Sequence, residues 1–412
     1  MTTLHTSTAG REALPARPRA ALPALCATQI TGYGVLYYAF PVLTGHITAQ
    51  TGWPTGQVTA AFTAALLLSA AVGIPVGRIL DQRGPHLLMT GGSILGTAAL
   101  VIIATAPDLP VFAAGWLLAG TAMAATLYQP AFAALARWHD TDRVRALTTL
   151  TLAAGLASTV FAPLTAILAA HLTWRDTYLT LAAVLGAITI PAHALALRGP
   201  WTRDETGPLP GIPRQRPQAR ITTSRPFLLL AVAMTVSGFA LYGVIFGLVP
   251  LLTHRGMSPT LAAWALGLGG LGQTLGRTAY AAFTRRTSVR ARTVALIAAG
   301  GATTLLLALV PGPTPLLIAL VILAGGVRGN FTLLQATAVI DRWGTTAYGH
   351  LSGILAAPIA IAEALTPFAA ATLVHPLGGY PQLFAALAAT SAVAALLASG
   401  TSIGGGVSGS TD

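Results

Sequence analysis

Long apolar stretches alternate with short polar connections along the chain from about residue 20 onward. A helix of about 20 apolar residues is long enough to cross the hydrocarbon core of a bilayer. Twelve such stretches can be read, at 20–47, 55–79, 86–106, 110–136, 146–170, 177–197, 226–252, 259–283, 293–311, 315–340, 349–373 and 381–398. The pattern predicts an all-α membrane protein with twelve transmembrane helices.

The composition supports this prediction. Hydrophobic residues make up 54% of the 412 residues and charged residues only 8%, whereas about 25% of the residues in a soluble globular protein are charged. Twelve helices with their connections use the whole length, so we expect no separate soluble domain and no enzyme activity. Cys26 is the one cysteine. A disulfide framework and a thiolate metal cluster are therefore excluded, and we expect no metal and no cofactor.

The arginines follow the apolar stretches in a regular way. The 23 basic residues are all arginines and contribute to a net charge of +12. Apart from Arg175, Arg255 and Arg328, they lie before the first stretch, or at the end of every second stretch and in the connection after it. Positively charged connections stay on the cytoplasmic side of a membrane. We therefore expect a multi-pass protein of the cell membrane with both termini in the cytoplasm, and no nucleic-acid partner.

The same pattern predicts how the chain is divided into domains. The predicted segments are a cytoplasmic N-terminal segment at 1–19, a six-helix bundle at 20–197, a cytoplasmic linker at 198–225, a second six-helix bundle at 226–399 and a disordered cytoplasmic tail at 400–412. The linker is rich in proline and arginine, and such a composition cannot bury a hydrophobic core.

The second half of the chain repeats features of the first. Gly73 to Arg78 end the second apolar stretch in the same way as Gly272 to Arg277 end the eighth. The pair Arg137-Trp138 after the fourth stretch likewise returns as Arg342-Trp343 after the tenth. Repeats of this kind predict two pseudo-symmetric bundles with a solute site at their interface near the bilayer midplane.

The connection after the second stretch resembles the signature loop of the major facilitator superfamily. Gly77, Asp81 and Gly84 occupy the positions of its glycine, aspartate and second glycine, and Arg83 supplies positive charge. The resemblance extends over the whole chain. It implies a secondary transporter that works by alternating access, with these four residues as a gate and Asp81 bonded to the other half of the protein in one transport state.

The chain also departs from this family pattern. Gln82 and Pro85 replace basic residues of the loop, and Tyr280 stands where the second copy would carry aspartate. The stretch from Tyr128 to Pro130, with Arg137-Trp138 after it, is similar to the branch that moves monocarboxylates and related organic anions. A degenerate antiporter signature around Pro163 leaves drug or metabolite export open as an alternative.

Two charged residues lie in the middle of apolar stretches, Arg328 in the tenth and Glu363 in the eleventh. A charge at the bilayer centre costs ~2.5–3.5 kcal/mol on insertion scales, and the helical rise puts these two at the same depth within a turn. Either they form a buried ion pair that only fixes two helices, or they handle solute and protons. Arginine keeps its proton and suits an anion, so in the second interpretation Arg328 binds substrate and Glu363 couples protons.

Polar residues in other stretches complete the predicted substrate site. They are Gln29, Tyr33, Tyr37, Gln129, Tyr242, Gln273, Asn330 and Gln335. Helices 1, 4, 7 and 10 face the cavity in the family, although amides and tyrosines also bridge helices. His193 lies near the end of a stretch and is expected at the membrane interface. Gly267 to Gly272 match a dinucleotide-binding fingerprint by their letters, but lie inside an apolar stretch and are expected to pack helices.

Together these observations predict a monomeric transporter in the lipid bilayer. Its expected partners are a small organic solute, preferably an organic anion, and protons, moved by symport or antiport. A proton-driven drug or metabolite exporter is the alternative within the same class. A non-transporting membrane sensor or scaffold is the alternative from another class.

Overall fold

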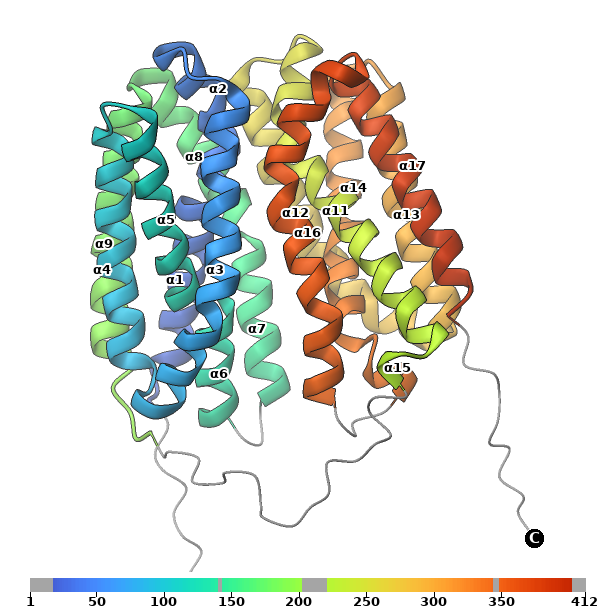
Figure 1. Cartoon of the computed structure of the whole chain (residues 1–412), viewed down its shortest axis with the longest axis horizontal. Coiled ribbons are helices and arrows are strands. Elements are labelled where there is room, and N and C mark those ends of the chain that lie inside the picture. The colour runs from blue at the N-terminus through green and yellow to red at the C-terminus, as the bar shows by residue number, and fades with distance from the viewer. Residues whose placement is uncertain (1–17, 140–142, 202–220, 344–347, 402–412) are drawn as a thin grey trace, which may run out of the picture.

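The computed structural model describes residues 18–139, 143–201, 221–343 and 348–401. The predicted N-terminal segment before residue 18, most of the predicted linker and residues 402–412 of the predicted tail therefore lie outside the described residues. The described chain forms two bundles of helices that stand side by side (Figure 1).

The first bundle contains the helical elements up to Ala196. They are α1 (Ala21–Tyr33), the π-helical turn η1 (Gly34–Tyr38), α2 (Ala39–Thr51), α3 (Thr55–Arg83), α4 (Pro85–Thr105), α5 (Leu109–Thr126), α6 (Tyr128–Trp138), α7 (Arg143–Gly155), α8 (Ala157–His171) and α9 (Trp174–Ala196). The elements α1, η1 and α2 form one crossing of the bilayer, and the pairs α5–α6 and α7–α8 form one crossing each.

The second bundle begins at Arg225. Its elements are α11 (Arg225–His254), α12 (Pro259–Arg286), α13 (Val289–Leu309), α14 (Thr314–Thr337), the short α15 (Ile340–Trp343), α16 (Tyr348–Leu377) and α17 (Tyr380–Ser399). Within the described residues, ten helical segments are long and apolar enough to cross a membrane. The first crossing, divided into short helical elements, and the glycine-rich α12 bring the total to twelve. The predicted fold class is confirmed.

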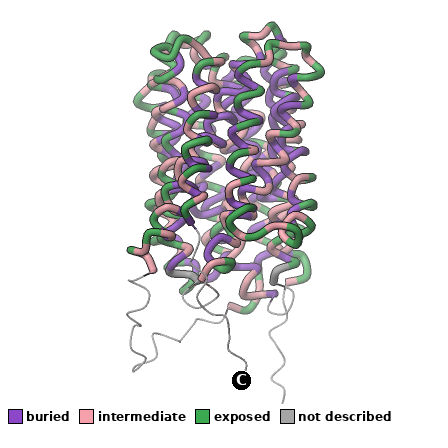
Figure 2. Tube along the Cα trace, turned by 90° about the vertical axis from the view of Figure 1, so that its right-hand side faces the viewer, coloured by how far each residue is buried: buried purple, intermediate pink, exposed green. Residues whose placement is uncertain are grey.

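The outer surface of the bundles is apolar, as lipid contact requires. Large hydrophobic side chains are exposed on several helices, including Ile74 at 64%, Leu195 at 66% and Leu396 at 73%. Buried residues lie along the bundles from end to end, with exposed residues among them (Figure 2). Exposed apolar side chains on a protein of this size are typical of a membrane-facing surface.

A break between α5 and α6 explains the position of one predicted site residue. Pro130 has no backbone N–H and cannot bond the carbonyl of Thr126 four residues earlier. The side chain of Gln29 in α1 donates from Nε2 to this carbonyl at 2.7 Å. A buried carbonyl without a partner is costly in an apolar interior, so Gln29 stabilises the break.

Glycines bring pairs of helices into backbone contact. A Cβ atom added at Gly325 in α14 would lie 1.9 Å from the carbonyl oxygen of Gly269 in α12, and one at Gly272 would lie 2.2 Å from that of Ile322. The first bundle repeats the arrangement, since a Cβ at Gly120 in α5 would lie 2.2 Å from the Ala65 carbonyl oxygen in α3. Small residues allow such close approach in membranes. The packing interpretation of the glycines between Gly267 and Gly272 is confirmed.

We expect Gly325→Ala to destabilise the second bundle, because its methyl group would meet the Gly269 backbone, which cannot move aside as a side chain can. Overpacking of a tight contact costs about 1–3 kcal/mol. The measurement is the thermal unfolding midpoint in detergent. Gly91→Ala in α4, with nothing within 4 Å of its added Cβ, is the control and should leave the midpoint unchanged or raise it. Equal midpoints for the two variants would contradict the close contact.

Among the described residues, the two bundles touch chiefly along two pairs of helices, α3 with α16 and α8 with α12. We call the end of the bundles that carries the α3–α4 connection and residues 198–201 the linker end. Away from this end, the Phe368 N–H of α16 donates to Thr63 Oγ1 of α3 at 3.3 Å. At a similar level, the ring of Phe246 in α11 packs 5.6 Å from that of Tyr37 and 5.8 Å from that of Phe62. These contacts join the bundles at the end opposite the linker end.

A candidate solute cavity between the two bundles

A cavity of about 400 Å³ lies between the bundles. Both halves of the chain line it, from η1 and α3 on one side to α12 and α16 on the other. Its polar and aromatic lining residues are Tyr33, Tyr37, Tyr38, Ser69, Tyr128, Gln129, Tyr242, Gln273, Arg277, Thr332 and Glu363. A concave site with a mainly apolar wall and a few convergent polar groups is the usual form of a small-molecule site.

The structure brings six of the predicted site residues together in this cavity. They are Tyr33, Tyr37, Gln129, Tyr242, Gln273 and Glu363. The break at Leu127 helps to position Gln129 and its neighbour Tyr128, because both stand in the first turn of α6 immediately after it.

Four predicted residues do not line the cavity. Gln29 bonds the Thr126 carbonyl, and Asn330 donates from Nδ2 to the Gly326 carbonyl of its own helix at 2.9 Å. Gln335 lies beside the carboxylate of Glu363. Arg328 is only 6% exposed and lies behind Gln273, donating from Nη2 to Gln273 Oε1 at 3.2 Å.

Arg328 and Glu363 do not form an ion pair in this structure, although both are among the described residues. Arg328 bonds Gln273 in α12, whereas Oε1 of Glu363 faces Gly238 in α11 and has no hydrogen-bond partner. The depth argument from the sequence gives the height of a residue along its helix. It does not give the face on which the side chain lies, so it could not decide whether the two residues meet.

Arg277 is a cavity residue that the sequence reasoning missed. Its guanidinium lines the cavity, is 8% exposed, and donates from Nη1 to the Thr151 carbonyl across the bundle interface. Its positive charge also acts on the hydroxyl of Tyr128, which lines the same cavity. The sequence analysis attributed Arg277 to topology along with the other arginines of α12. The available signal was its depth, about two and a half helical turns, or ~13 Å, inside Arg286 at the helix end.

The predicted gate residues lie at the linker end, and Asp81 is bonded within its own bundle. Its carboxylate forms an ion pair with Arg137 of α6 at 3.0 Å. Arg83 is exposed, and no atom other than local backbone lies within 4 Å of a Cβ added at Gly77. In this conformation Asp81 therefore does not bond the second bundle, the contact that the family resemblance implies for one transport state.

Trp201 holds residues 198–201, which follow α9, against the predicted gate residues. Its Nε1 donates to the backbone carbonyl of Asp81 at 3.1 Å, and the Arg137 guanidinium lies 4.5 Å from its ring centre. Gly84 has a φ of +77°, and an added Cβ would lie 3.0 Å from the Trp201 ring. Both the backbone conformation and the packing therefore require glycine at this position.

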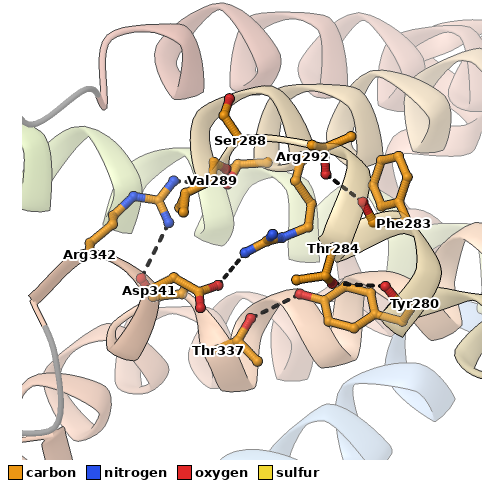
Figure 3. Close-up of polar contacts among 12 residues, drawn as sticks. Tyr280, Phe283, Thr284, Ser288, Val289, Arg292, Thr337, Asp341 and Arg342 are labelled. Atoms are coloured by element: carbon orange, nitrogen blue, oxygen red, sulfur yellow. Dashed lines mark hydrogen bonds and ion pairs between the residues drawn. The ribbon is translucent and has the colours of Figure 1, made fainter.

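The second bundle has a different network at the corresponding place (Figure 3). The Tyr280 hydroxyl bonds Thr337 Oγ1 at 2.9 Å, and Arg292 forms an ion pair with Asp341. The acid that α12 lacks at Tyr280 is thus supplied by α15, next to Arg342. This arrangement explains how the second half keeps a charged contact without the aspartate of the loop signature.

One further residue departs from the prediction. His193, expected at the membrane interface, is fully buried in the first bundle. Its Nδ1 lies 2.8 Å from Ser93 Oγ, and its Nε2 lies 3.0 Å from Thr28 Oγ1. The two hydroxyls satisfy both ring nitrogens, which is why a polar ring is tolerated between α1, α4 and α9.

Comparison with known proteins supports a transport cavity. The sequence model described as Major Facilitator Superfamily matches residues 25–356. The chain belongs to the major facilitator superfamily. Membership in this superfamily makes the chain a multi-pass membrane protein of a transporter family and not an enzyme.

Among curated proteins, the chain resembles monocarboxylate transporter 13 of two mammals. The match is 30% identical over 212 residues for Bos taurus and 27% identical over 221 residues for Rattus norvegicus. Each match covers 50% of this chain, and 48% and 47% of the two relatives. The chain spans about half the length of the curated relatives that it matches.

Solved transporters of the superfamily share the fold. A mutant form of the nucleoside transporter NupG matches with a TM-score of 0.74 and 14% identity, over 92% of this chain and 98% of that one. An inward-facing, occupied bacterial homologue of the human lysosomal transporter Spinster matches with a TM-score of 0.68 and 14% identity, over 92% of each chain. At such identities the similarity shows the fold alone.

Proposed function

We propose that the protein is a secondary active transporter that moves a small organic anion across the cell membrane by alternating access, with coupling to protons. The observation that carries the proposal is the cavity between the two bundles, which contains the guanidinium of Arg277 and the carboxylate of Glu363. The resemblance of half the chain to monocarboxylate transporter 13 supports the anionic substrate.

Arg277 is the residue proposed to bind the anion. A guanidinium keeps its charge and offers two parallel N–H groups to a carboxylate. Because Arg277 also contacts Thr151 in the first bundle, an anion bound to it would lie where the bundles move relative to each other. Arg328 acts from behind Gln273, to which it donates, and adds positive potential to the cavity wall.

Glu363 is the residue proposed to carry the coupled proton. It is the only acidic residue among those that line the described cavity. Oε1 has no partner, so the carboxyl can take up a proton without breaking a hydrogen bond at that atom. Burial in an apolar wall favours the neutral form of a carboxyl group.

The contacts between the bundles at the end opposite the linker end are those expected of an inward-facing state of the proposed cycle. They close the cavity at the end opposite the linker end, through Phe246 and its neighbours and through the bond from Phe368 to Thr63. The linker end is cytoplasmic if the arginine pattern sets the topology.

This topology has a direct test. Reporter fusions after residues 215 and 288 should be active only in the cytoplasm, and fusions after residues 52 and 313 only outside it, because arginine-rich connections are retained inside. The measurement is a paired cytoplasmic and extracytoplasmic reporter assay. The reverse pattern would overturn the proposed orientation.

We expect Asp81→Asn to slow transport strongly while leaving expression and substrate binding intact. Loss of an exposed ion pair costs only about 0–1 kcal/mol of stability, but the substitution removes the carboxylate proposed to bond the other bundle. Initial uptake rates and binding are measured on the same preparations. Asp108→Asn is the control, because Asp108 caps α5 at the other end and asparagine caps equally well. Uptake at the wild-type rate by Asp81→Asn would remove the gating role.

Uptake by purified protein in lipid vesicles tests the function itself. An imposed pH gradient should drive accumulation of an organic acid above its equilibrium concentration. A drug or metabolite exporter would instead move cationic compounds, drawn to Glu363. A sensor or scaffold would move neither.

A further inference from the structure

The wall of the cavity is unusually rich in tyrosine. Five of the nine tyrosines in the chain line it, from three different crossings of the bilayer: Tyr33, Tyr37, Tyr38, Tyr128 and Tyr242. The rings of the first four form a connected series. The Tyr33 ring centre lies 4.7 Å from that of Tyr128 and 6.4 Å from that of Tyr37, and Tyr37 lies 5.2 Å from Tyr38.

This series connects the two charged residues of the cavity. At one end, Tyr128 shares the cavity wall with Arg277, whose charge acts on its hydroxyl. At the other end, Tyr37 and Tyr242 both lie within electrostatic range of Glu363. If the carboxylate of a solute binds Arg277, the rest of the solute molecule would therefore lie beside aromatic rings. Aromatic rings at centroid distances of about 4.5–7 Å attract one another beyond the effect of buried area.

The charges at the cavity favour one negative charge on the solute. Among the residues that line the described cavity, Arg277 brings the one positive charge, because Arg328 lies behind Gln273 and Glu363 is neutral when it holds the coupled proton. A solute with a single negative charge would leave the buried site neutral, and neutral buried sites avoid the high cost of an uncompensated charge.

The size of the cavity argues against a very small acid. A volume of about 400 Å³ lies within the range, roughly 300–1,000 Å³, of sites that enclose drug-sized ligands. An acid of three carbons would leave most of this volume, and most of the tyrosine wall, in contact with water.

We propose that the preferred substrates are aromatic monocarboxylates, with the carboxylate on Arg277 and the ring against Tyr33, Tyr37 and Tyr128. This inference rests on the proposed function, since it specifies the anion that the same cavity carries. The hydroxyls of Tyr37 and Tyr242 remain available to bond a polar substituent on the ring.

Four matched probes test the inference on the purified full-length chain. They are phenylpropionate, cyclohexylpropionate of similar size without an aromatic ring, propionate without any ring, and phenethylamine with the opposite charge. Binding is measured by calorimetry. Phenylpropionate should bind about 2- to 10-fold more tightly than cyclohexylpropionate because of ring–ring attraction, and about 10- to 100-fold more tightly than propionate because of the buried ring area.

Variants of the wall provide the second measurement. Tyr128→Leu should remove most of the preference for phenylpropionate over cyclohexylpropionate, whereas Tyr128→Phe should keep it. Tyr380→Leu is the matched control, since Tyr380 begins α17 and does not line the cavity. The preference should survive this change.

The outcomes separate the two proposals. If phenylpropionate and cyclohexylpropionate bind equally and both need Arg277, the anion transporter stands and the aromatic substrate class is wrong. If phenethylamine binds and no acid does, the proposed function fails and the aromatic monocarboxylate fails with it.

Discussion

Arg277→Gln should abolish binding of organic anions while the protein still folds. Removing one partner of a buried, hydrogen-bonded charge pair costs about 2–5 kcal/mol of binding free energy, so we expect the affinity for the anion to fall by about 30-fold or more. Glutamine can still donate a hydrogen bond to the Thr151 carbonyl, which Arg277 bonds in the structure, so the interface between the bundles should survive. Binding is measured by calorimetry and folding by the thermal unfolding midpoint.

Two further variants make this result specific. Arg277→Lys keeps the positive charge but loses the planar pair of N–H groups, and should weaken binding less than the glutamine variant does. Arg285→Gln changes an exposed arginine of the same helix and should have no effect. If Arg277→Gln binds anions as the wild type does, the anion site lies elsewhere.

Glu363→Gln should separate exchange from accumulation. The variant cannot release or take up a proton at this position, so it should still exchange labelled for unlabelled substrate. A pH gradient should no longer drive net accumulation. For the wild type, one proton per anion predicts about tenfold accumulation for each pH unit. For the variant, the pH gradient should leave the ratio of internal to external concentration unchanged. Accumulation by the variant at the wild-type ratio would show that another group couples the proton.

The double variant Arg328→Gln, Glu363→Gln tests the remaining structural alternative. If the two residues stabilised each other as a buried pair, each single change would cost ~3–5 kcal/mol and the double change would restore folding. The structure shows no ion pair between them, and Arg328 bonds Gln273 instead. We therefore expect no rescue, and we expect Arg328→Gln to weaken anion binding less than Arg277→Gln does.

The sequence predicted the architecture well because helix length and apolar character are local properties. The repeat of Gly73 to Arg78 as Gly272 to Arg277 gave the internal symmetry, and the glycines of α12 were read correctly as packing residues. These features depend on neighbours within one or two turns of the same helix, so no knowledge of partners was needed.

The cavity was harder to predict, because it depends on the face that each residue turns toward another helix. Glu363 and Gln273 were assigned to it and line it, whereas Arg328 was assigned to it and lies behind Gln273. Gln29 was assigned to the cavity, but it donates instead to the carbonyl of Thr126, which Pro130 leaves without a partner. Thr126 is nearly a hundred residues away from Gln29 along the chain. Arg277 was overlooked because its charge also fitted the topological pattern.

The backbone contact between α12 and α14 has a consequence for how substrate choice can change. These helices hold Gln273, Arg277 and Thr332 of the cavity, and their glycines leave no space for a larger side chain. Laboratory or natural selection for a new solute should therefore find few tolerated substitutions where α12 packs against α14. Variation should concentrate on α1, η1 and α6 in the first bundle, which carry four of the five cavity tyrosines. The charged side of the cavity would then change slowly and the aromatic side quickly. Related chains would therefore all carry anionic solutes, but the part of the solute away from the carboxylate would differ in shape from chain to chain.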